Sequence, residues 1–261
     1  MHPELFRIGN FPIRSFGVMV IIGWLVAIWV GKVRAKRFGL PPDRIIDLGI
    51  FMVIAGIIGA RLVYVLLEWD YYGKNLSQIV YINEGGMTSF GGMIFGLLAM
   101  YLWCRKNKFQ ISNVLDMAVA PVLIAWGFGR IGCFLNGCCY GGETEVFCAV
   151  QFPGMHTTVH PAQLYDSAMN FFFGGLLLVM EKRNWNKQPY PPMGFLAAWG
   201  LIFFGVGRFV YESFRIGSSS EPISPGAMLT LAHIAALAMF IAGVVWLILL
   251  RGKNRQTAEE P

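Results

Sequence analysis

Residues 240–250 read Phe-Ile-Ala-Gly-Val-Val-Trp-Leu-Ile-Leu-Leu, an unbroken apolar run near the C-terminal end of the chain. A transmembrane strand shows short alternating apolar and polar positions, and this run shows none. A helix that crosses a bilayer needs about 20 mostly apolar residues. The run and its flanks, over about 226–250, therefore predict a transmembrane helix.

Windows of the same kind recur six times upstream, near 15–31, 45–67, 88–104, 111–131, 164–180 and 193–213. The composition agrees, because 56% of the residues are hydrophobic, only 14% are charged and the mean hydropathy is +0.55. The sequence predicts an all-α polytopic membrane protein with about seven transmembrane helices. Since no internal repeat or low-complexity tract interrupts it, we expect one domain over 1–261.

Basic residues indicate how the helices are oriented. Most of the 21 Lys and Arg follow the first, third, fifth and seventh windows, in the segments 32–44, 105–108, 182–187 and 251–255. By the positive-inside rule these segments face the cytoplasm, so we expect the N-terminus outside and the C-terminus inside. Two longer outer segments, about 69–87 and 132–163, would form arms or caps.

Four arginines lie within or at one end of apolar windows: Arg61, Arg130, Arg208 and Arg215. An arginine at the centre of a membrane helix costs about 2.5–3.5 kcal/mol, so each is a candidate for binding an anion. A guanidinium fork matches phosphate oxygens, and lipid headgroups lie at this depth. For Arg130 and Arg208 we expect a ligand anion, whereas internal pairing is an equal alternative for Arg61. The carboxylates available for pairing are Glu68, Glu84, Asp166 and Glu212.

Residues 127–141 read Gly-Phe-Gly-Arg-Ile-Gly-Cys-Phe-Leu-Asn-Gly-Cys-Cys-Tyr-Gly. This stretch resembles the signature of the prolipoprotein diacylglyceryl transferases, Gly-Arg-x-Gly-Asn-Phe-x-Asn-x-Glu-x-x-Gly. The matching positions are Gly129, Arg130, Gly132, Phe134, Asn136 and Gly141. Further matches are Gly59-Ala60-Arg61, Gly85-Gly86-Met87 before Gly91-Gly92, His160 to Tyr165, and Arg208 to Arg215. The family has seven helices in the inner membrane with its N-terminus outside, in agreement with the topology that the charges predict.

The resemblance implies a reaction. A diacylglyceryl group would pass from phosphatidylglycerol to the lipobox cysteine thiol of a preprolipoprotein, forming a thioether and releasing glycerol phosphate. Arg130 and Arg208 occupy the positions of the family's essential arginines, where they would stabilise the charge that grows on the departing phosphate. Six further residues would support this pocket: Arg61, Gly91, Gly92, Asn136, Glu212 and Arg215.

The chain departs from the family's pattern at four positions. Phe90 stands where many members have a histidine proposed as the base, and Phe16 replaces a tyrosine. Within the signature, Cys133 replaces Asn and Cys138 replaces Glu. These changes indicate either a divergent subfamily that uses other residues or a relative whose activity has changed, and we favour the first.

Two residues could replace the missing base. His160 is the first candidate, although it could equally be an ordinary hydrogen-bonded loop histidine. Glu212 is the second, and it lies four residues after Arg208 and three before Arg215. That spacing puts the three on one helix face, so we prefer a positioning role for Glu212.

The cysteines raise three further possibilities: a disulfide, a zinc site and a different enzymatic activity. An oxidising exterior permits a disulfide, for example of Cys138 or Cys139 with Cys148. A zinc site with His156 lacks the usual paired spacing, so we expect no metal and no cofactor. A membrane thiol–disulfide oxidoreductase is the alternative enzyme, but no Cys-x-x-Cys motif exists and the arginines would have no role.

A non-catalytic phospholipid-binding protein is the third reading, and it would keep the arginines without turnover. The net charge of +6 reflects the cytoplasmic loops, so nucleic acid is not an expected partner. The expected partners are phosphatidylglycerol, preprolipoprotein signal peptides and membrane lipids.

Overall fold

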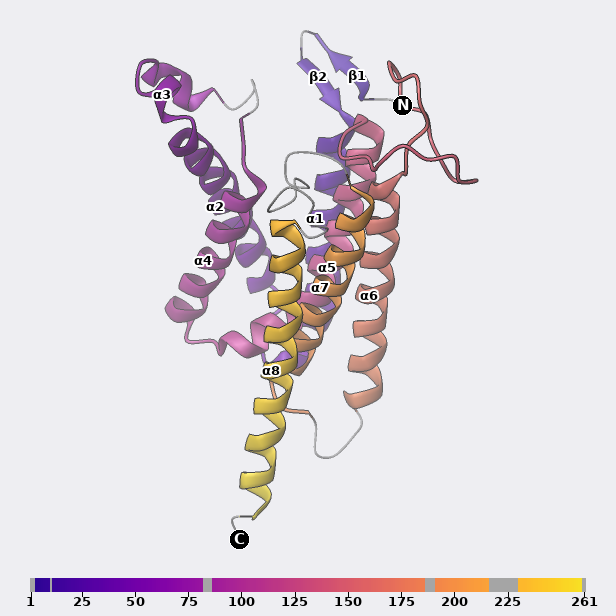
Figure 1. Ribbon diagram of the computed structural model, residues 1–261. Helices are drawn as coiled ribbons and strands as arrows, with labels where there is room; N and C mark the ends of the chain where they lie inside the picture. Colours follow the sequence, from indigo (N-terminus) through magenta and orange to yellow (C-terminus); the bar gives the residue numbers. More distant parts are fainter. Residues whose placement is uncertain (1–2, 10, 82–85, 186–190, 216–229, 260–261) are drawn as a thin grey trace. The chain divides into compact units, whose positions relative to one another are not determined.

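The computed structural model describes residues 3–9, 11–81, 86–185, 191–215 and 230–259. This part of the chain contains seven long helices, each overlapping one of the expected windows (Figure 1). They are α1 (Ser15–Ala35), α2 (Arg44–Leu67), α4 (Ser89–Asn107), α5 (Ile111–Asn136), α6 (Ala162–Trp185), α7 (Phe195–Phe214) and α8 (Leu231–Glu259). The expected pairing partner Glu84, the motif residue Gly85 and the first residues of the last window, 226–229, lie outside the described residues.

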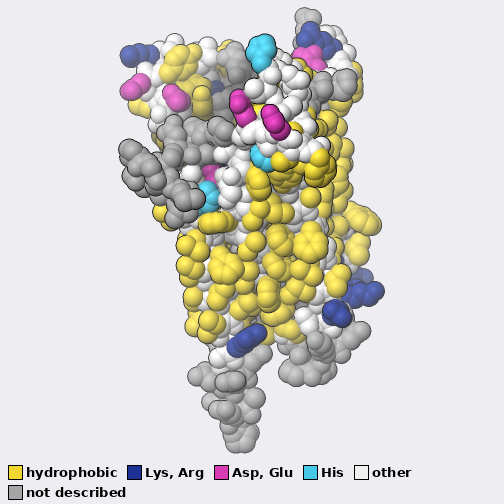
Figure 2. Space-filling model, turned by 45° about the vertical axis from the view of Figure 1, so that its right-hand side comes forward, with side chains coloured by type: hydrophobic (Ala, Val, Ile, Leu, Met, Phe, Trp, Pro, Cys, Tyr) yellow, Lys and Arg dark blue, Asp and Glu magenta, His cyan; other side chains and the backbone are white. Residues whose placement is uncertain are grey.

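Five of the described helices, α1, α2, α5, α7 and α8, are long and apolar enough to cross a membrane. The other two long helices, α4 and α6, have lower mean hydropathy. α4 ends in Arg105 and Lys106, and α6 carries buried polar side chains along its first half. Large apolar side chains point outward instead of into a core: Trp29 is 67% exposed and Ile58 is 58% exposed. Figure 2 shows such side chains covering the middle of one face. These observations support an all-α polytopic membrane protein.

The chain divides into two compact units, and the expectation of a single domain stays a prediction. The first unit contains residues 1–30 and 115–261, and the second contains residues 31–114. In the first, β1 (Glu4–Ile8) and β2 (Phe11–Arg14) form an antiparallel hairpin before α1. The second includes the 3₁₀ helix η1 (Lys36–Phe38), the short helix α3 (Trp69–Tyr72) and the 3₁₀ helix η2 (Leu76–Val80).

In the second unit, glycines allow α2 and α4 to pack closely. A Cβ atom at Gly91 would lie 2.5 Å from the carbonyl oxygen of Gly59, and one at Gly92 would lie 3.3 Å from that of Gly56. Small residues permit such backbone approach between membrane helices. Helix packing therefore accounts for Gly91 and Gly92, and their role in binding a substrate stays a prediction.

In the first unit, α7 packs against both α6 and α8 and is the most buried of the candidate spans. A single side chain of α5 fixes where α7 begins. The buried carboxylate of Asp116 accepts hydrogen bonds from the backbone N–H groups of Gly194 and Ala197, both at 2.7 Å. An acidic group at a helix N-terminus satisfies free N–H groups and complements the helix dipole.

α5 continues five residues beyond the expected window, to Asn136. The residues after 131 are still mostly apolar, and the first residue there with a left-handed backbone is Gly137, whose φ is 73°. The N–H of Gly137 donates to the carbonyl of Phe134, and that of Cys138 donates to the carbonyl of Cys133. This is a Schellman cap. Because of it, Cys133 and Asn136 belong to the last turn of α5, and the segment from 137 to 161 forms the connection to α6.

Candidate active site

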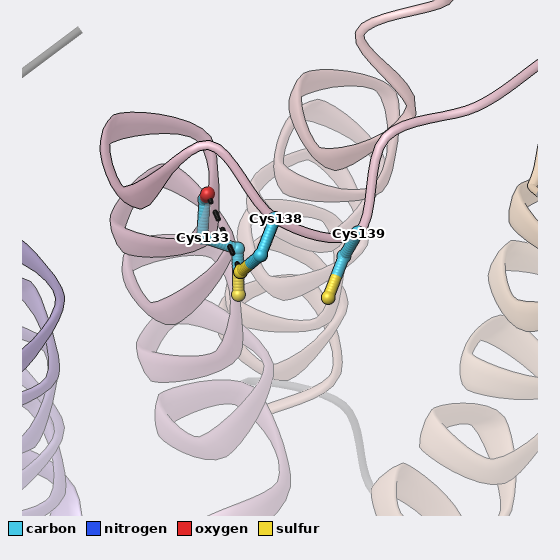
Figure 3. Close-up of side chains that lie close together, drawn as sticks. All are labelled: Cys133, Cys138 and Cys139. Atoms are coloured by element: carbon cyan, nitrogen blue, oxygen red, sulfur yellow. Dashed lines mark hydrogen bonds between the residues drawn. The ribbon is translucent and has the colours of Figure 1, made fainter. Parts of the chain in front are cut away.

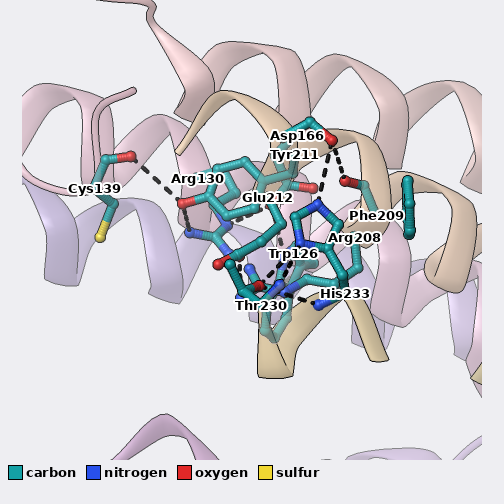
Figure 4. Close-up of polar contacts among 11 residues, drawn as sticks. Trp126, Arg130, Cys139, Asp166, Arg208, Phe209, Tyr211, Glu212, Thr230 and His233 are labelled. Carbon is teal, nitrogen blue, oxygen red and sulfur yellow. Dashed lines mark hydrogen bonds and ion pairs between the residues drawn. The ribbon is translucent and has the colours of Figure 1, made fainter. Parts of the chain in front are cut away.

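Three guanidinium groups surround the ring of Tyr211, which is fully buried. Figure 4 shows two of them, those of Arg130 and Arg208. The Cζ atoms of Arg130, Arg208 and Arg215 lie 4.6, 5.1 and 5.8 Å from the ring centroid. Tyr211 follows Arg208 by three residues and precedes Arg215 by four, so α7 and its C-cap present all three on one side. Cation–π attraction contributes about 0.5–2 kcal/mol per contact, and here it offsets repulsion among three like charges.

Two of these arginines have buried carboxylate partners. The Nε atom of Arg130 lies 2.7 Å from Asp166 Oδ2 on α6, and Arg208 Nη2 lies 2.8 Å from Glu212 Oε2. Both arginines are therefore paired internally, and the expectation that they also bind a ligand anion stays a prediction. A buried guanidinium without a counter-charge is strongly destabilising, and these carboxylates supply that charge. The preferred positioning role of Glu212 agrees with its ion pair.

The site nevertheless keeps an excess of positive charge, because three guanidinium groups face two carboxylates. Arg215 Nε is buried and has no hydrogen-bond partner among the described residues. An unsatisfied buried donor costs about 1–3 kcal/mol, which an anionic ligand would recover. Arg130 Nη1 donates to the Tyr211 hydroxyl at 3.2 Å, and that hydroxyl donates to the backbone oxygen of Cys139 at 3.4 Å. The site is therefore suited to an anion such as a phosphate.

His160 lies in an aromatic cluster beside this site. Its ring is 5.1 Å from the ring of Phe214, and its Nδ1 atom is 3.3 Å from the hydroxyl of Tyr165. The same hydroxyl lies 3.0 Å from the thiol of Cys148. The backbone of His160 pairs with Gly142. These contacts give His160 a structural role, and its role as a base stays a prediction.

Asn136 is exposed at the end of α5, where its side chain lies near the Cys138 thiol. All five cysteines are free thiols, so the possible disulfide with Cys148 is not formed. The sulfur atoms of Cys133, Cys138 and Cys139 lie within 4.8 Å of one another (Figure 3). Hydrogen bonds with the Cys133 and Cys138 thiols lower the pKa of the Cys139 thiol, and nearby guanidinium groups add to this effect.

Arg61 belongs to the second unit and is 7% exposed. Its guanidinium donates to four backbone carbonyls, those of Gln78 (2.6 Å), Ile79 (2.9 Å), Tyr81 (3.1 Å) and Gly86 (2.9 Å). It therefore holds the segment around η2 in place. That role explains an arginine at this position without a lipid phosphate, and the substrate-binding role of Arg61 stays a prediction.

Sequence reasoning named three arginines and Glu212 correctly as neighbours, but it missed Tyr211. The signal was present, because an aromatic residue three positions after one arginine and four before another must share their helix face. Asp166 was named only as one of four possible counter-charges. Its spacing along the chain from Arg130 gives no sign that the two meet.

A family model described as prolipoprotein diacylglyceryl transferase matches residues 3–249 of the chain. The chain belongs to this family. A phosphatidylglycerol–prolipoprotein diacylglyceryl transferase of Clostridium tetani is 31% identical over 249 residues, covering 94% of this chain and 96% of the relative. Proteins with the same name from Clostridium novyi and Finegoldia magna are each 30% identical, and they align with 100% and 92% of this chain and with the same shares of their own lengths.

Proposed function

We propose that this protein transfers the diacylglyceryl group of phosphatidylglycerol to the lipobox cysteine thiol of preprolipoproteins, the first step of lipoprotein maturation. The product is a thioether, and glycerol phosphate is released. The family match over 3–249 is the observation that carries the proposal, since relatives that align with nearly the whole chain bear the name of this transferase.

The arginine site supports the same reaction. Displacement at the glycerol carbon moves negative charge onto the departing phosphate oxygens. Fixed guanidinium groups in a water-poor site stabilise such charge, and loss of one comparable donor costs about 10²–10³ in rate. The excess positive charge around Tyr211 and the buried Nε of Arg215 make this the most suitable place for the phosphate among the described residues.

We propose the following roles for individual residues. Arg130 and Arg208 hold the headgroup phosphate, and Arg215 and Glu212 support them. We also assign substrate binding to Arg61, Asn136, Gly91 and Gly92, with Arg61 acting through the segment that it holds. His160 is the candidate base for the substrate thiol.

The membrane arrangement is part of the proposal. Seven helices cross the bacterial inner membrane, with the N-terminus outside and the C-terminus in the cytoplasm. The segments 69–87 and 137–161 are then outer arms or caps. The seven helices form one working domain, and the lipid and the signal peptide are its partners.

Reconstitution of the purified chain with phosphatidylglycerol and a fluorescent lipobox peptide tests the proposal. We expect a thioether-linked diacylglyceryl peptide and no product with phosphatidylethanolamine. Arg130→Lys and Arg208→Lys keep the charge but lose the planar fork, so we expect each to slow transfer by about 100-fold. Arg105→Lys, an exposed position at the end of α4, is the matched control.

The alternatives give different results. A phospholipid-binding protein would take up phosphatidylglycerol through the same arginines and form no thioether. A thiol–disulfide oxidoreductase would exchange disulfides with a test substrate and would be insensitive to Arg208→Lys. Absence of transfer by the folded protein across several anionic lipids would refute the proposed reaction.

A further inference from the structure

The turn that ends α5 brings three thiols together. The Schellman cap places Cys138 against the last turn of the helix, where its thiol also donates to the carbonyl of Cys133 at 3.6 Å. Cys139 then adopts a left-handed backbone with φ of 64°, which is uncommon for a residue other than glycine. Figure 3 shows the three sulfur atoms on the same side of this turn. The fold thus keeps a strained residue where its sulfur joins the other two.

This geometry suits a zinc ion. Zinc–sulfur bonds of about 2.3 Å in a tetrahedral site put each pair of sulfurs about 3.8 Å apart. The three sulfur atoms already lie within 4.8 Å of one another, so shifts of about 1 Å or less would complete the site. Among the described residues, no carboxylate or imidazole joins this group as a fourth ligand. Three protein ligands and one open position are the pattern of catalytic zinc, whereas structural zinc has four.

The thiol cluster lies next to the arginine site. Arg130 is one helical turn before Cys133, and the backbone oxygen of Cys139 accepts the hydrogen bond of Tyr211. A zinc ion with three thiolates carries one net negative charge, and the guanidinium groups offset it. A nucleophile on the zinc would therefore be adjacent to a leaving phosphate on the arginines.

We propose that Cys133, Cys138 and Cys139 bind one zinc ion whose fourth position takes the lipobox cysteine of the substrate. This role rests on the proposed transferase function. Binding to zinc deprotonates the substrate thiol, and its proton goes to solvent. The sulfur electron pair forms the new C–S bond while the C–O bond to the phosphate breaks. That bonding pair leaves with glycerol phosphate, and the neutral thioether, a weaker ligand than a thiolate, dissociates.

The zinc would supply what the chain lacks at Phe90. A free thiol with a pKa near 8.5 is about 3% ionised at pH 7, so full ionisation on zinc raises the thiolate population about 30-fold. We expect Cys139→Ser to slow transfer about 30-fold at pH 7. The deficit should shrink toward pH 9, because the free substrate thiol ionises there without help. A variant that merely damaged the fold would lose activity equally at every pH.

Metal content gives a test that does not depend on activity. The full-length protein, purified in detergent with a non-thiol reductant and supplied with zinc, should retain one zinc ion per chain. Serine at any of the three positions should remove most of that zinc. Cys104→Ser and Cys148→Ser are the matched controls, because these thiols lie outside the cluster, and both should keep the metal.

Replacing zinc with cobalt allows binding at the open coordination position to be followed by absorption. A lipobox peptide should change the thiolate-to-cobalt absorption, and the same peptide with serine in place of cysteine should not. Arginine-dependent transfer by a protein that holds no zinc, or a disulfide within the cluster under the same conditions, would overturn the zinc site and leave the proposed function intact. Cysteine-dependent zinc and a cobalt response without any transfer would confirm the metal site and refute the function.

Discussion

Replacing Tyr211 with phenylalanine removes one oxygen atom from the centre of the arginine site and leaves the ring in place. That oxygen accepts a hydrogen bond from Arg130 at 3.2 Å and donates one to the backbone of Cys139 at 3.4 Å. A hydrogen bond to a charged group contributes about 1.5–3 kcal/mol, and the long distances favour the lower end. About 1.4 kcal/mol corresponds to a factor of ten in rate. We therefore expect kcat/KM for diacylglyceryl transfer to fall about tenfold.

Tyr211→Leu removes the ring as well. Three guanidinium groups then lose their shared aromatic contact, each worth about 0.5–1 kcal/mol, and they repel one another without it. The expected additional loss is about 10- to 100-fold. Transfer to a fluorescent lipobox peptide in phosphatidylglycerol micelles measures both variants, and thermal unfolding in the same detergent shows whether each is folded.

Tyr101 provides the matched control, since it lies exposed on α4 in the second unit. Tyr101→Phe and Tyr101→Leu should transfer at the wild-type rate. The reasoning fails if Tyr211→Phe keeps the full rate, or if the folded Leu variant is no slower than the Phe variant. Either result would mean that Tyr211 does not position the guanidinium groups.

Three further perturbations follow from the contacts. Asp166→Asn leaves the buried Arg130 without its counter-charge and should cost about 3–5 kcal/mol of stability. Phosphatidylglycerol should raise the Tm of this variant more than that of the wild type, and an equal rise would contradict the prediction. Arg61→Lys cannot keep four carbonyl partners, so amide exchange over Leu76–Val80 should accelerate about 10- to 100-fold, and unchanged exchange would exclude the holding role. Gly141→Ala places a Cβ atom against the carbonyl of Phe214, so Tm and transfer should both fall, whereas Gly175→Ala, which meets no neighbour, should change neither.

The helices were predictable because membrane-length apolar windows leave few alternatives. Each long helix overlaps its window, and the difference that bears on the site is at the end of α5. The residues from Ile131 to Leu135 are still mostly apolar, whereas the end of the helix is decided by the backbone conformation of Gly137. A hydropathy window does not detect a cap of this kind, so the sequence assigned Cys133 to a loop.

The site was predictable where residues share a helix and unpredictable where they come from different helices. The spacing of Arg208, Glu212 and Arg215 along the chain is enough to predict that they are neighbours. The pairing of Arg130 with Asp166 joins α5 to α6 and depends on how the bundle packs. The sequence did not predict the thiol cluster for a related reason. The usual zinc-ligand spacings belong to other kinds of turn than the one that follows α5.

The carboxylate of Asp116 fixes the position and rotation of α7 at its N-terminal end, whereas the arginine site lies at its C-terminal end. Gly194 is 14 residues before Arg208, about 21 Å along an α-helix, and a helix transmits both translation and rotation over that length. One residue inserted near 200 would shift everything beyond it by about 1.5 Å and turn it by about 100°. Tyr211 would then face away from Arg130 although no residue of the site had changed. Sequence changes at the start of α7 are thus constrained by length as well as by composition.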